Sequence, residues 1–276
     1  MPDPAGPVLE AVDLCKSFGD FTAVDGVTLT LAVGASLAVV GESGSGKTTT
    51  ARMVAGLERP TSGTVRWHGD DPGGDAGPVP TRGDRARNVQ MVFQDPYSSL
   101  DRRQRVGDCV AEALALHTDL RAGALDRRVA ELLGQVGLDA GQARSLPRAL
   151  SGGQRQRVAI ARALAVQPRL LILDEAVAAL DVSVQAQIIA LLRDIRRRTD
   201  ISYLFITHDL GIVRHICDDV MVMHQGRVVE RGPTDAVLTE PRMPYTRSLV
   251  DSVPRRGWRP RRRTTYHADA AAPPSG

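Results

Sequence analysis

The stretch SLAVVGESGSGKTTT, residues 36–50, decides the fold of this chain. Its first five residues form an apolar run that predicts a buried strand, and the residues after Lys47 predict a helix. Between them lies a loop that begins with Gly41 and is rich in glycine. This order predicts an anion-binding site, because glycines let consecutive backbone N–H groups curl around a phosphate and the helix presents its positive N-terminus there.

The loop fits the P-loop pattern, in which four residues separate a first glycine from Gly-Lys-Thr. Lys47 is one of only two lysines in a chain with 33 arginines. A flexible ammonium can reach the β- and γ-phosphates of a nucleotide, where a planar guanidinium fits less well. We therefore interpret Lys47 as a lysine that could not be replaced by arginine because it contacts these phosphates. Thr48 would offer its hydroxyl to Mg²⁺. The predicted nucleotide-binding residues of the loop are Gly41, Glu42, Ser43, Gly44, Ser45, Gly46, Lys47, Thr48 and Thr49.

A second candidate site follows the apolar run at residues 170–173, which leads directly into Asp174 and Glu175. Such a run is typical of a central parallel strand. Asp174 suits a magnesium ligand, because Mg²⁺ uses few carboxylates and keeps several waters. Glu175 lies one residue further, outside the strand, and could polarise an attacking water. Without other motifs, the pair could be no more than a charged residue pair at the edge of a loop. Because the chain also contains a P-loop, the catalytic interpretation is favoured.

A third motif is LSGGQ at residues 150–154, which precedes a predicted helix. Ser151, Gly152 and Gly153 could form a second anion-binding helix N-terminus. They could equally be an ordinary N-cap serine with two glycines for a turn. A second phosphate-binding helix start is hard to explain in a monomer that binds one nucleotide.

Strands alternate with helices along the chain, which predicts an α/β fold with a mostly parallel sheet. Residues 8–40 alternate as two strands around a turn at Gly19-Asp20. The pattern is helical from about residue 95 to 165 and predicts an inserted lobe. Residues 69–84 are rich in Gly, Pro and Asp and predict a surface loop. A later amphipathic helix is expected to bury Val184, Ile188, Leu191 and Ile195 on one face.

Composition excludes several classes of protein. Apolar residues make up 42% of the chain and charged residues 24%, which are ordinary globular values. The net charge of +3 comes from six arginines at residues 255–263, so the remainder is slightly acidic, which argues against a nucleic-acid-binding body. Cys15, Cys109 and Cys217 lie far apart, which favours reduced thiols. The chain shows neither a signal peptide at residues 1–10 nor an apolar run that could cross a bilayer.

In this order, the motifs resemble those of the nucleotide-binding subunits of ABC transporters, over residues 8 to 253. The other matching motifs are VFQDP with Gln94, AALD ending at Asp181, and ITHD with His208. The resemblance implies an ABC ATPase domain over residues 8–250. Its fold would be that of a P-loop NTPase, with a mostly parallel core sheet, an antiparallel β subdomain and an inserted helical subdomain at about 95–165. ATP and Mg²⁺ would be the cofactors.

The resemblance also implies roles for single residues. Glu175, His208, Gln94 and Lys47 would act in catalysis, with His208 contacting the γ-phosphate and supporting Glu175. Thr48, Gln94 and Asp174 would serve the metal. Phe18 falls where the family stacks an aromatic ring on adenine, although a lone Phe in a strand is also typical of a core.

Subunits of this family pair head to tail, so that LSGGQ of one closes over ATP bound to the other. On that model Ser151, Gly152, Gly153 and Gln154 would bind the partner's nucleotide, and Asp181 would act across the interface. The loop at residues 176–181 departs from the family's Pro-Thr-Ser-Ala-Leu-Asp. Ala178 lacks the usual hydroxyl, which could weaken hydrogen bonding between subunits.

Residues 232–254 form a C-terminal extension that resembles the one in oligopeptide, dipeptide and nickel importer ATPases. Met243-Pro244-Tyr245-Thr246 stands where many members have His-Pro-Tyr-Thr. The resemblance implies a peripheral protein at the cytoplasmic face of the cell membrane. It would work with a second ATPase subunit (a paralogue or another copy), two permeases and, indirectly, a solute-binding protein.

Peptides are the favoured substrates, and other functions stay open. A nickel importer is the nearest alternative, followed by a drug exporter, against which the C-terminal extension argues. A soluble ABC ATPase acting on DNA or ribosomes is also conceivable, but such proteins typically carry two cassettes or coiled-coil arms, which do not fit in 276 residues. The basic tail at 255–276 is predicted to be disordered and either solvated or in contact with anionic lipid.

Overall fold

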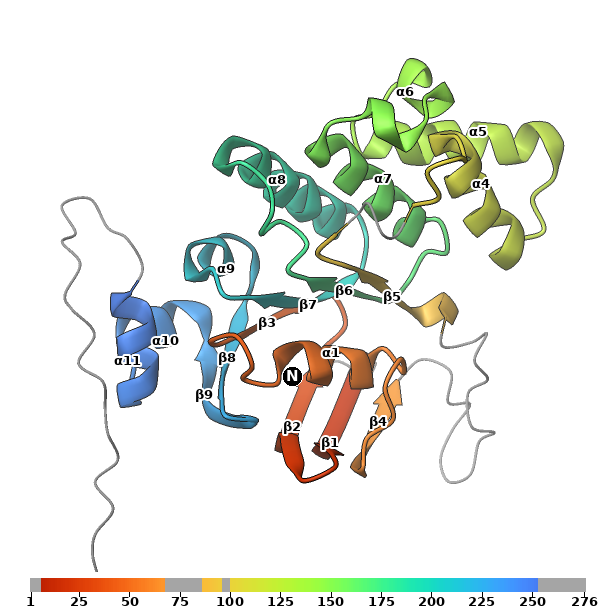
Figure 1. Cartoon of the computed structure of the whole chain (residues 1–276). Helices are drawn as coiled ribbons and strands as arrows, with labels where there is room; N and C mark the ends of the chain where they lie inside the picture. Colours follow the sequence, from red (N-terminus) through yellow and green to blue (C-terminus); the bar gives the residue numbers. More distant parts are fainter. Residues whose placement is uncertain (1–5, 68–85, 96–99, 253–276) are drawn as a thin grey trace, which may run out of the picture.

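The computed structural model describes residues 6–67, 86–95 and 100–252. Its largest sheet has the strand order β5-β6-β7-β3-β8-β9 (Figure 1). The strands are β3 (Ser36–Val40), β5 (Val89–Val92), β6 (Leu170–Asp174), β7 (Ser202–Thr207), β8 (Asp219–His224) and β9 (Arg227–Pro233). Only β9 runs antiparallel to its neighbour among these described strands, so the predicted mostly parallel sheet is confirmed. Strands β3, β6 and β7 are buried throughout, as expected of a sheet covered on both faces.

A three-stranded antiparallel sheet of order β2-β1-β4 covers one face of the large sheet, with α1 (Lys47–Val54) between them (Figure 1). Strands β1 (Leu9–Phe18) and β2 (Phe21–Leu31) form the predicted hairpin, and β4 (Ser62–Trp67) pairs with β1. Buried apolar side chains of β1, β2 and α1 form one cluster with side chains from the facing side of β3, β6 and β7.

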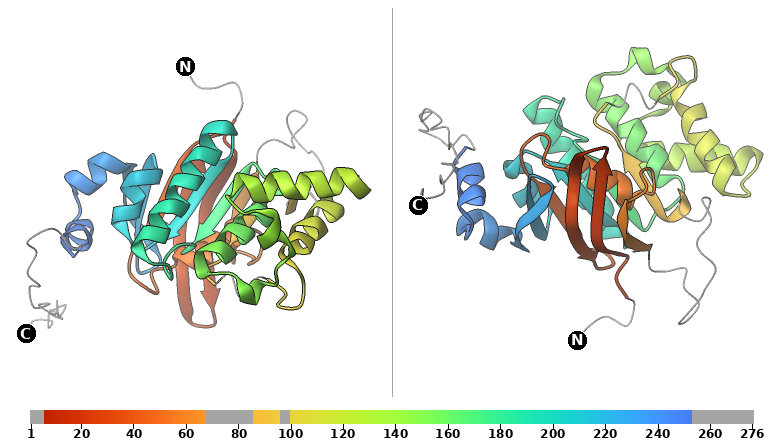
Figure 2. Two further views of the ribbon diagram at one scale, coloured as in Figure 1. Left: turned by 90° about the horizontal axis from the view of Figure 1, so that it is seen from above. Right: turned by 60° about the horizontal axis from the view of Figure 1, so that its bottom comes forward.

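Helices α8 (Val182–Arg198) and α9 (Leu210–Ile216) cover the opposite face of the large sheet (Figure 2). The inserted segment forms the helices α4 (Val106–His117), α5 (Ala122–Gln135), α6 (Ala140–Arg144) and α7 (Gly152–Leu164), with a 3₁₀ turn at Pro147–Ala149. These helices gather at one end of the molecule (Figure 1). Their buried side chains belong to the same apolar cluster as those of α8 and α9.

The buried face of α8 differs in part from the prediction. Ile188 and Ile195 are buried as expected, whereas Val184 and Leu191 are only partly buried. Ile189 and Leu192 are also buried, giving a stripe at positions i, i+1, i+4 and i+7. Val184 and Leu191 still pack against the same core cluster, so the apolar face is wider than the sequence pattern suggested and extends to Ile189 and Leu192.

Two short helices follow β9: α10 (Thr234–Thr239) and α11 (Pro244–Asp251). The sequence patterns did not predict either of them. The predicted loop at 69–84 and the predicted tail at 255–276 lie outside the described residues. Within the part of the chain that the structure describes, no helix has the length and apolar character needed to span a membrane.

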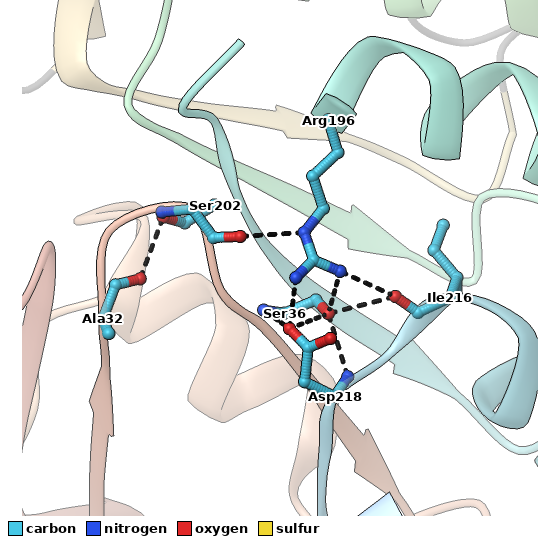
Figure 3. Close-up of polar contacts among 7 residues, drawn as sticks. Ala32, Ser36, Arg196, Ser202, Ile216 and Asp218 are labelled. Atoms are coloured by element: carbon cyan, nitrogen blue, oxygen red, sulfur yellow. Dashed lines mark hydrogen bonds and ion pairs between the residues drawn. The ribbon is translucent and has the colours of Figure 1, made fainter. Parts of the chain in front are cut away.

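Arg196, near the end of α8, ties this helix to the start of two core strands (Figure 3). Its Nε donates to the carbonyl of Gly34 at 2.8 Å, and its Nη1 donates to Ser36 Oγ at 2.7 Å. The guanidinium also pairs with Asp218, whose carboxylate accepts a hydrogen bond from Ser36 N at 2.9 Å. Because β3 begins at Ser36, this network anchors the amino-terminal end of β3, at the end of the sheet opposite to the glycine-rich loop.

Replacing Arg196 by methionine is expected to lower the free energy of unfolding by about 2 kcal/mol, because charged hydrogen bonds contribute about 1.5–3 kcal/mol and Asp218 is half exposed. Arg197→Met is the matched control. Its side chain is 69% exposed and its Nη1 lies 3.8 Å from Asp194 Oδ1, so its loss should change stability by less than about 0.5 kcal/mol. Urea denaturation of both variants measures the difference, and equal stabilities would contradict this role for Arg196.

Candidate nucleotide-binding site

The glycine-rich loop between β3 and α1 is closely enclosed by neighbouring backbone. A Cβ atom on Gly41 would lie 2.2 Å from the carbonyl oxygen of Met223 in β8. A Cβ on Gly46 would lie 2.5 Å from the carbonyl oxygen of Ala23 in β2, and Gly46 has φ of +97°. Any side chain at these two positions would therefore clash with the protein's own backbone, even when no ligand is bound.

Lys47 is the first residue of α1 and is only 5% exposed. Its Nζ donates to the carbonyl of Gly41 at 2.9 Å and to that of Glu42 at 2.7 Å, so the ammonium lies within the curl of the loop. Burial lowers the pKa of Lys47, and the nearby carboxylates of Glu175, Asp174 and Glu42 oppose this effect. A phosphate in the loop would meet a partly desolvated cation, whose attraction for an anion is stronger than in water.

The loop has further features that fit a phosphate group. The hydroxyl of Ser45 is buried and has no hydrogen-bond partner among the described residues. Gly44 has φ of +79°, in the left-handed region that lets successive N–H groups converge. The backbone N–H groups at the start of α1 add the positive end of a helix. These donors fit the phosphates of a nucleotide.

Thr48 and Asp174 lie together beside Lys47. Thr48 Oγ1 donates to Asp174 Oδ1 at 3.3 Å, and the Asp174 side chain is almost fully buried. Burial raises the pKa of the Asp174 carboxyl, while the hydrogen bond from Thr48 opposes that shift. A hydroxyl and a carboxylate at the edge of a phosphate site are the hard oxygen ligands that Mg²⁺ prefers. The geometry fits the predicted metal role of both residues.

Glu175 and His208 follow the adjacent parallel strands β6 and β7, whose carboxyl ends meet at one edge of the sheet. His208 Nδ1 lies 3.4 Å from Glu175 Oε1. Glu175 has φ of +47°, which is uncommon for a residue other than glycine, and its N–H donates to the carbonyl of Ile206 at 2.9 Å. The backbone thus turns the Glu175 side chain away from the strand and places it beside His208.

The LSGGQ motif begins α7, and Ser151 is its N-cap. Ser151 Oγ accepts a hydrogen bond from Gln154 N at 3.3 Å, and Gln154 Oε1 accepts one from Ser151 N at 2.9 Å. A Cβ on Gly153 would lie 2.4 Å from Val184 of α8, while one on Gly152 would only touch Leu180 at 3.4 Å. Ser151 is therefore an N-cap as expected, whereas Gly152 and Gly153 are the first residues of α7 and do not form a separate turn. Contact with a partner's nucleotide stays a prediction.

Gln94 and Asp181 are both at the surface. Gln94 lies two residues beyond the end of β5, and its side chain is exposed. Asp181 precedes α8 without making a capping hydrogen bond, and the next side chain, Val182, is 82% exposed. Both predicted positions are thus accessible to another subunit.

Phe18 ends β1 beside the hairpin turn and is 50% exposed, so the alternative that it belongs to the core is wrong. The Nζ of Lys16 lies 4.9 Å from the centroid of the Phe18 ring, and it also pairs with Glu58 at 2.5 Å. The ring is held by this cation and still has surface available for an adenine base.

Phe18→Ala is expected to raise the KM for ATP with little change in kcat, because stacking on adenine stabilises the bound ground state and transition state equally. The expected loss is about 1–3 kcal/mol of binding, as for base stacking elsewhere. Phe21→Ala is the matched control, since Phe21 pairs with Phe18 across the hairpin and is 63% exposed. Steady-state kinetics should separate the two variants; equal KM values would remove Phe18 from the site.

A phosphate loop followed by a helix, with a buried lysine and carboxylates at the ends of neighbouring parallel strands, defines a P-loop nucleotide-binding site. Residues 24–178 match the model of the ABC transporter family, and residues 229–275 match the oligopeptide/dipeptide transporter C-terminal region. The chain therefore belongs to the ABC transporter family and is an ATPase of that family.

The chain is similar to several curated proteins over most of its length. It is 44% identical to the di/tripeptide transport ATP-binding protein DppF of Pseudomonas aeruginosa, covering 87% of this chain and 74% of that protein. It is 41% identical to the dipeptide transport ATP-binding protein DppF of Escherichia coli, covering 90% of this chain and 77% of that protein.

Solved structures confirm the predicted fold class. The cbiO1 protein of Clostridium perfringens, part of the ABC transporter complex cbiONQ, superposes with a TM-score of 0.74 at 30% identity, covering 85% of this chain and 92% of that one. The ATP-binding cassette MJ0796, a dimer in a post-hydrolysis state bound to ADP and Pi, gives a TM-score of 0.70 at 26% identity. The match covers 82% of this chain and 98% of that one.

Sequence reasoning missed the part of the site that comes from the C-terminal half. Glu42 N donates to the hydroxyl of Tyr245 in α11 at 3.1 Å, and Gly226 N, from the β8–β9 turn, donates to the carbonyl of Ser45 at 3.1 Å. The Met-Pro-Tyr-Thr stretch was the available signal, but it indicated a branch of the family and not a contact with the loop.

Proposed function

We propose that this chain is the ATP-binding and hydrolysing subunit of an ABC importer for dipeptides or oligopeptides, held at the cytoplasmic face of the cell membrane by permeases. The match of residues 229–275 to the oligopeptide/dipeptide transporter C-terminal region carries the proposal. The relatives named for di/tripeptide and dipeptide transport support it, since they align with most of this chain.

In this proposal the loop and Lys47 bind the β- and γ-phosphates of ATP, and Thr48, Asp174 and Gln94 hold Mg²⁺. The ion would neutralise charge on the phosphates. Glu175 takes a proton from the water that attacks the γ-phosphorus, and His208 keeps the Glu175 carboxylate oriented. The contact of 3.4 Å between these two side chains supports the pairing.

The proposal places the nucleotide between two ATPase subunits. Ser151, Gly152, Gly153 and Gln154 would close over the nucleotide of the partner, which is a paralogue or a second copy of this chain. Asp181 would contact that partner. The solvent-accessible position of Asp181 supports this arrangement, as does the dimeric state of the MJ0796 structure. Gln94 would link the site to two permeases, and a solute-binding protein would deliver the peptide to them.

Reconstitution with candidate peptide permeases tests the proposal. Vesicles would carry the ATPase on their inner side with ATP enclosed, and labelled dipeptide outside. Accumulation of dipeptide inside, lost with Glu175→Gln, is the expected result. Uptake of Ni²⁺ without peptide would make the protein a nickel importer subunit, and ATP-driven movement outward would make it an exporter subunit. An ATPase that binds no permease would belong to the soluble class.

A further inference from the structure

The peptide groups around Glu42 in the P-loop are held from two directions. The N–H of Glu42 donates to Tyr245 Oη at 3.1 Å, and its carbonyl accepts from Lys47 Nζ at 2.7 Å. Tyr245 is 203 residues further along the chain. A helix of the C-terminal extension therefore contacts the backbone of the loop that is proposed to bind phosphate.

Tyr245 is itself fixed in place. Its ring packs against that of His224, at the end of β8, with 4.0 Å between the centroids and an angle of 36° between the planes. The two residues that precede α11 are attached to β9, because Glu230 Oε1 accepts from Arg242 N at 2.8 Å and Oε2 accepts from Met243 N, the N-cap of α11, at 3.1 Å. Burial raises the pKa of the Tyr245 hydroxyl, which therefore stays protonated and neutral at physiological pH.

We propose that Tyr245 is a positioning residue of the nucleotide site, through which the C-terminal extension sets the affinity for ATP. The proposal rests on the phosphate-binding role of the loop given under the proposed function. With its N–H bound to Tyr245 and its carbonyl bound to Lys47, Glu42 holds the loop in its curled form before nucleotide arrives. Such preorganisation strengthens binding, because less ordering is required when the ligand binds.

Tyr245→Phe tests this role, since it removes the hydroxyl and keeps the ring on His224. Titration of the full chain with a fluorescent ATP analogue should show a Kd raised about 2- to 13-fold, the equivalent of the 0.5–1.5 kcal/mol of a neutral hydrogen bond. The rate of ATP hydrolysis at saturating ATP should be unchanged, because Tyr245 does not touch the reacting atoms. A lowered kcat with an unchanged Kd would overturn the proposal.

Tyr203→Phe is the matched control. Tyr203 Oη donates to the carbonyl of Leu192 at 2.9 Å, so this change also removes one bond between a phenol and the backbone. Tyr203 pairs with Ser36 at the start of β3, at the end of the sheet opposite to the P-loop. We expect a lower melting temperature with an unaltered Kd. If Tyr203→Phe raised the Kd as much as Tyr245→Phe, the effect would be one of general stability and the proposal would fail.

Glu230→Ala tests whether the C-terminal extension acts through Tyr245, because it frees the start of α11 at Arg242 and Met243 while Tyr245 itself remains. It should also raise the Kd, and Tyr245→Phe should add little in that background, since the two changes act on one contact. Full additivity would contradict action through Tyr245. The proposed function fails in a different way, namely if the unaltered chain does not bind the analogue or if Lys47→Ala binds it equally well.

Discussion

Replacing Lys47 by alanine is expected to abolish ATP hydrolysis in a chain that still folds. The Lys47 ammonium is buried and lies close to the carboxylates of Glu175, Asp174 and Glu42. Its loss would leave those negative charges uncompensated at the place where the γ-phosphate adds further negative charge. Removing one donor that stabilises transition-state charge costs about 10²–10³ in kcat, and the loss of a full charge should cost at least as much.

Lys47→Arg sharpens this prediction, because it keeps the charge and changes only the shape of the side chain. The Nζ of Lys47 donates to two carbonyls inside the loop, and the larger planar guanidinium of arginine does not fit in the place of this ammonium. We expect Lys47→Arg to be almost as inactive as Lys47→Ala. ATPase assays with circular dichroism on the same samples measure rate and fold together, and a folded Lys47→Ala variant with near-normal turnover would refute the assignment of the site.

Glu175→Gln is expected to bind ATP with nearly unaltered affinity and to hydrolyse it about 10²–10⁴ times more slowly, the usual contribution of a general base. Glutamine has the same shape as glutamate but cannot take a proton from water. The loop, Lys47 and Thr48 remain intact, so ATP should stay bound and hold two subunits together. Size-exclusion chromatography with ATP and Mg²⁺ should then show a dimer of ATPase subunits.

Glu131→Gln is the control for the Glu175 variant. Glu131 is 59% exposed on α5 and pairs with Arg128 three residues away, so turnover should be normal. If Glu175→Gln kept most of its activity, another group would have to be the base. His208 would then be examined first, because it is the side chain in contact with Glu175.

The sequence predicted the parts of the site that are encoded locally. The spacing of Gly41, Gly46 and Lys47 is a local pattern, and so is the step from an apolar strand into Asp174 and Glu175. Neighbouring parallel strands bring their ends together, which accounts for the meeting of Glu175 with His208. These features follow from residues that are close in sequence or from the rules of a parallel sheet.

Other features depend on long-range packing and could not be predicted in this way. Strand β1 has irregular pairing between Ala11 and Ser17, so simple alternation does not tell which way Phe18 faces. Arg196 and Tyr245 contact residues about 160 and about 200 positions away, and no local pattern marks either contact. Gly153 is explained only when Val184 of α8 is seen against it.

The central claim is that each ATP is bound between the P-loop of one subunit and the LSGGQ motif of the other. The most direct test is a structure of the ATPase pair in which this chain carries Glu175→Gln, determined with ATP and Mg²⁺. We predict one ATP with Lys47 at its β- and γ-phosphates, Phe18 at its adenine and the LSGGQ motif of the opposing subunit at its γ-phosphate. Ser151 of this chain should contact the nucleotide held by the opposing subunit. ATP bound in the P-loop of a lone subunit, with Ser151 still only capping α7, would contradict the account.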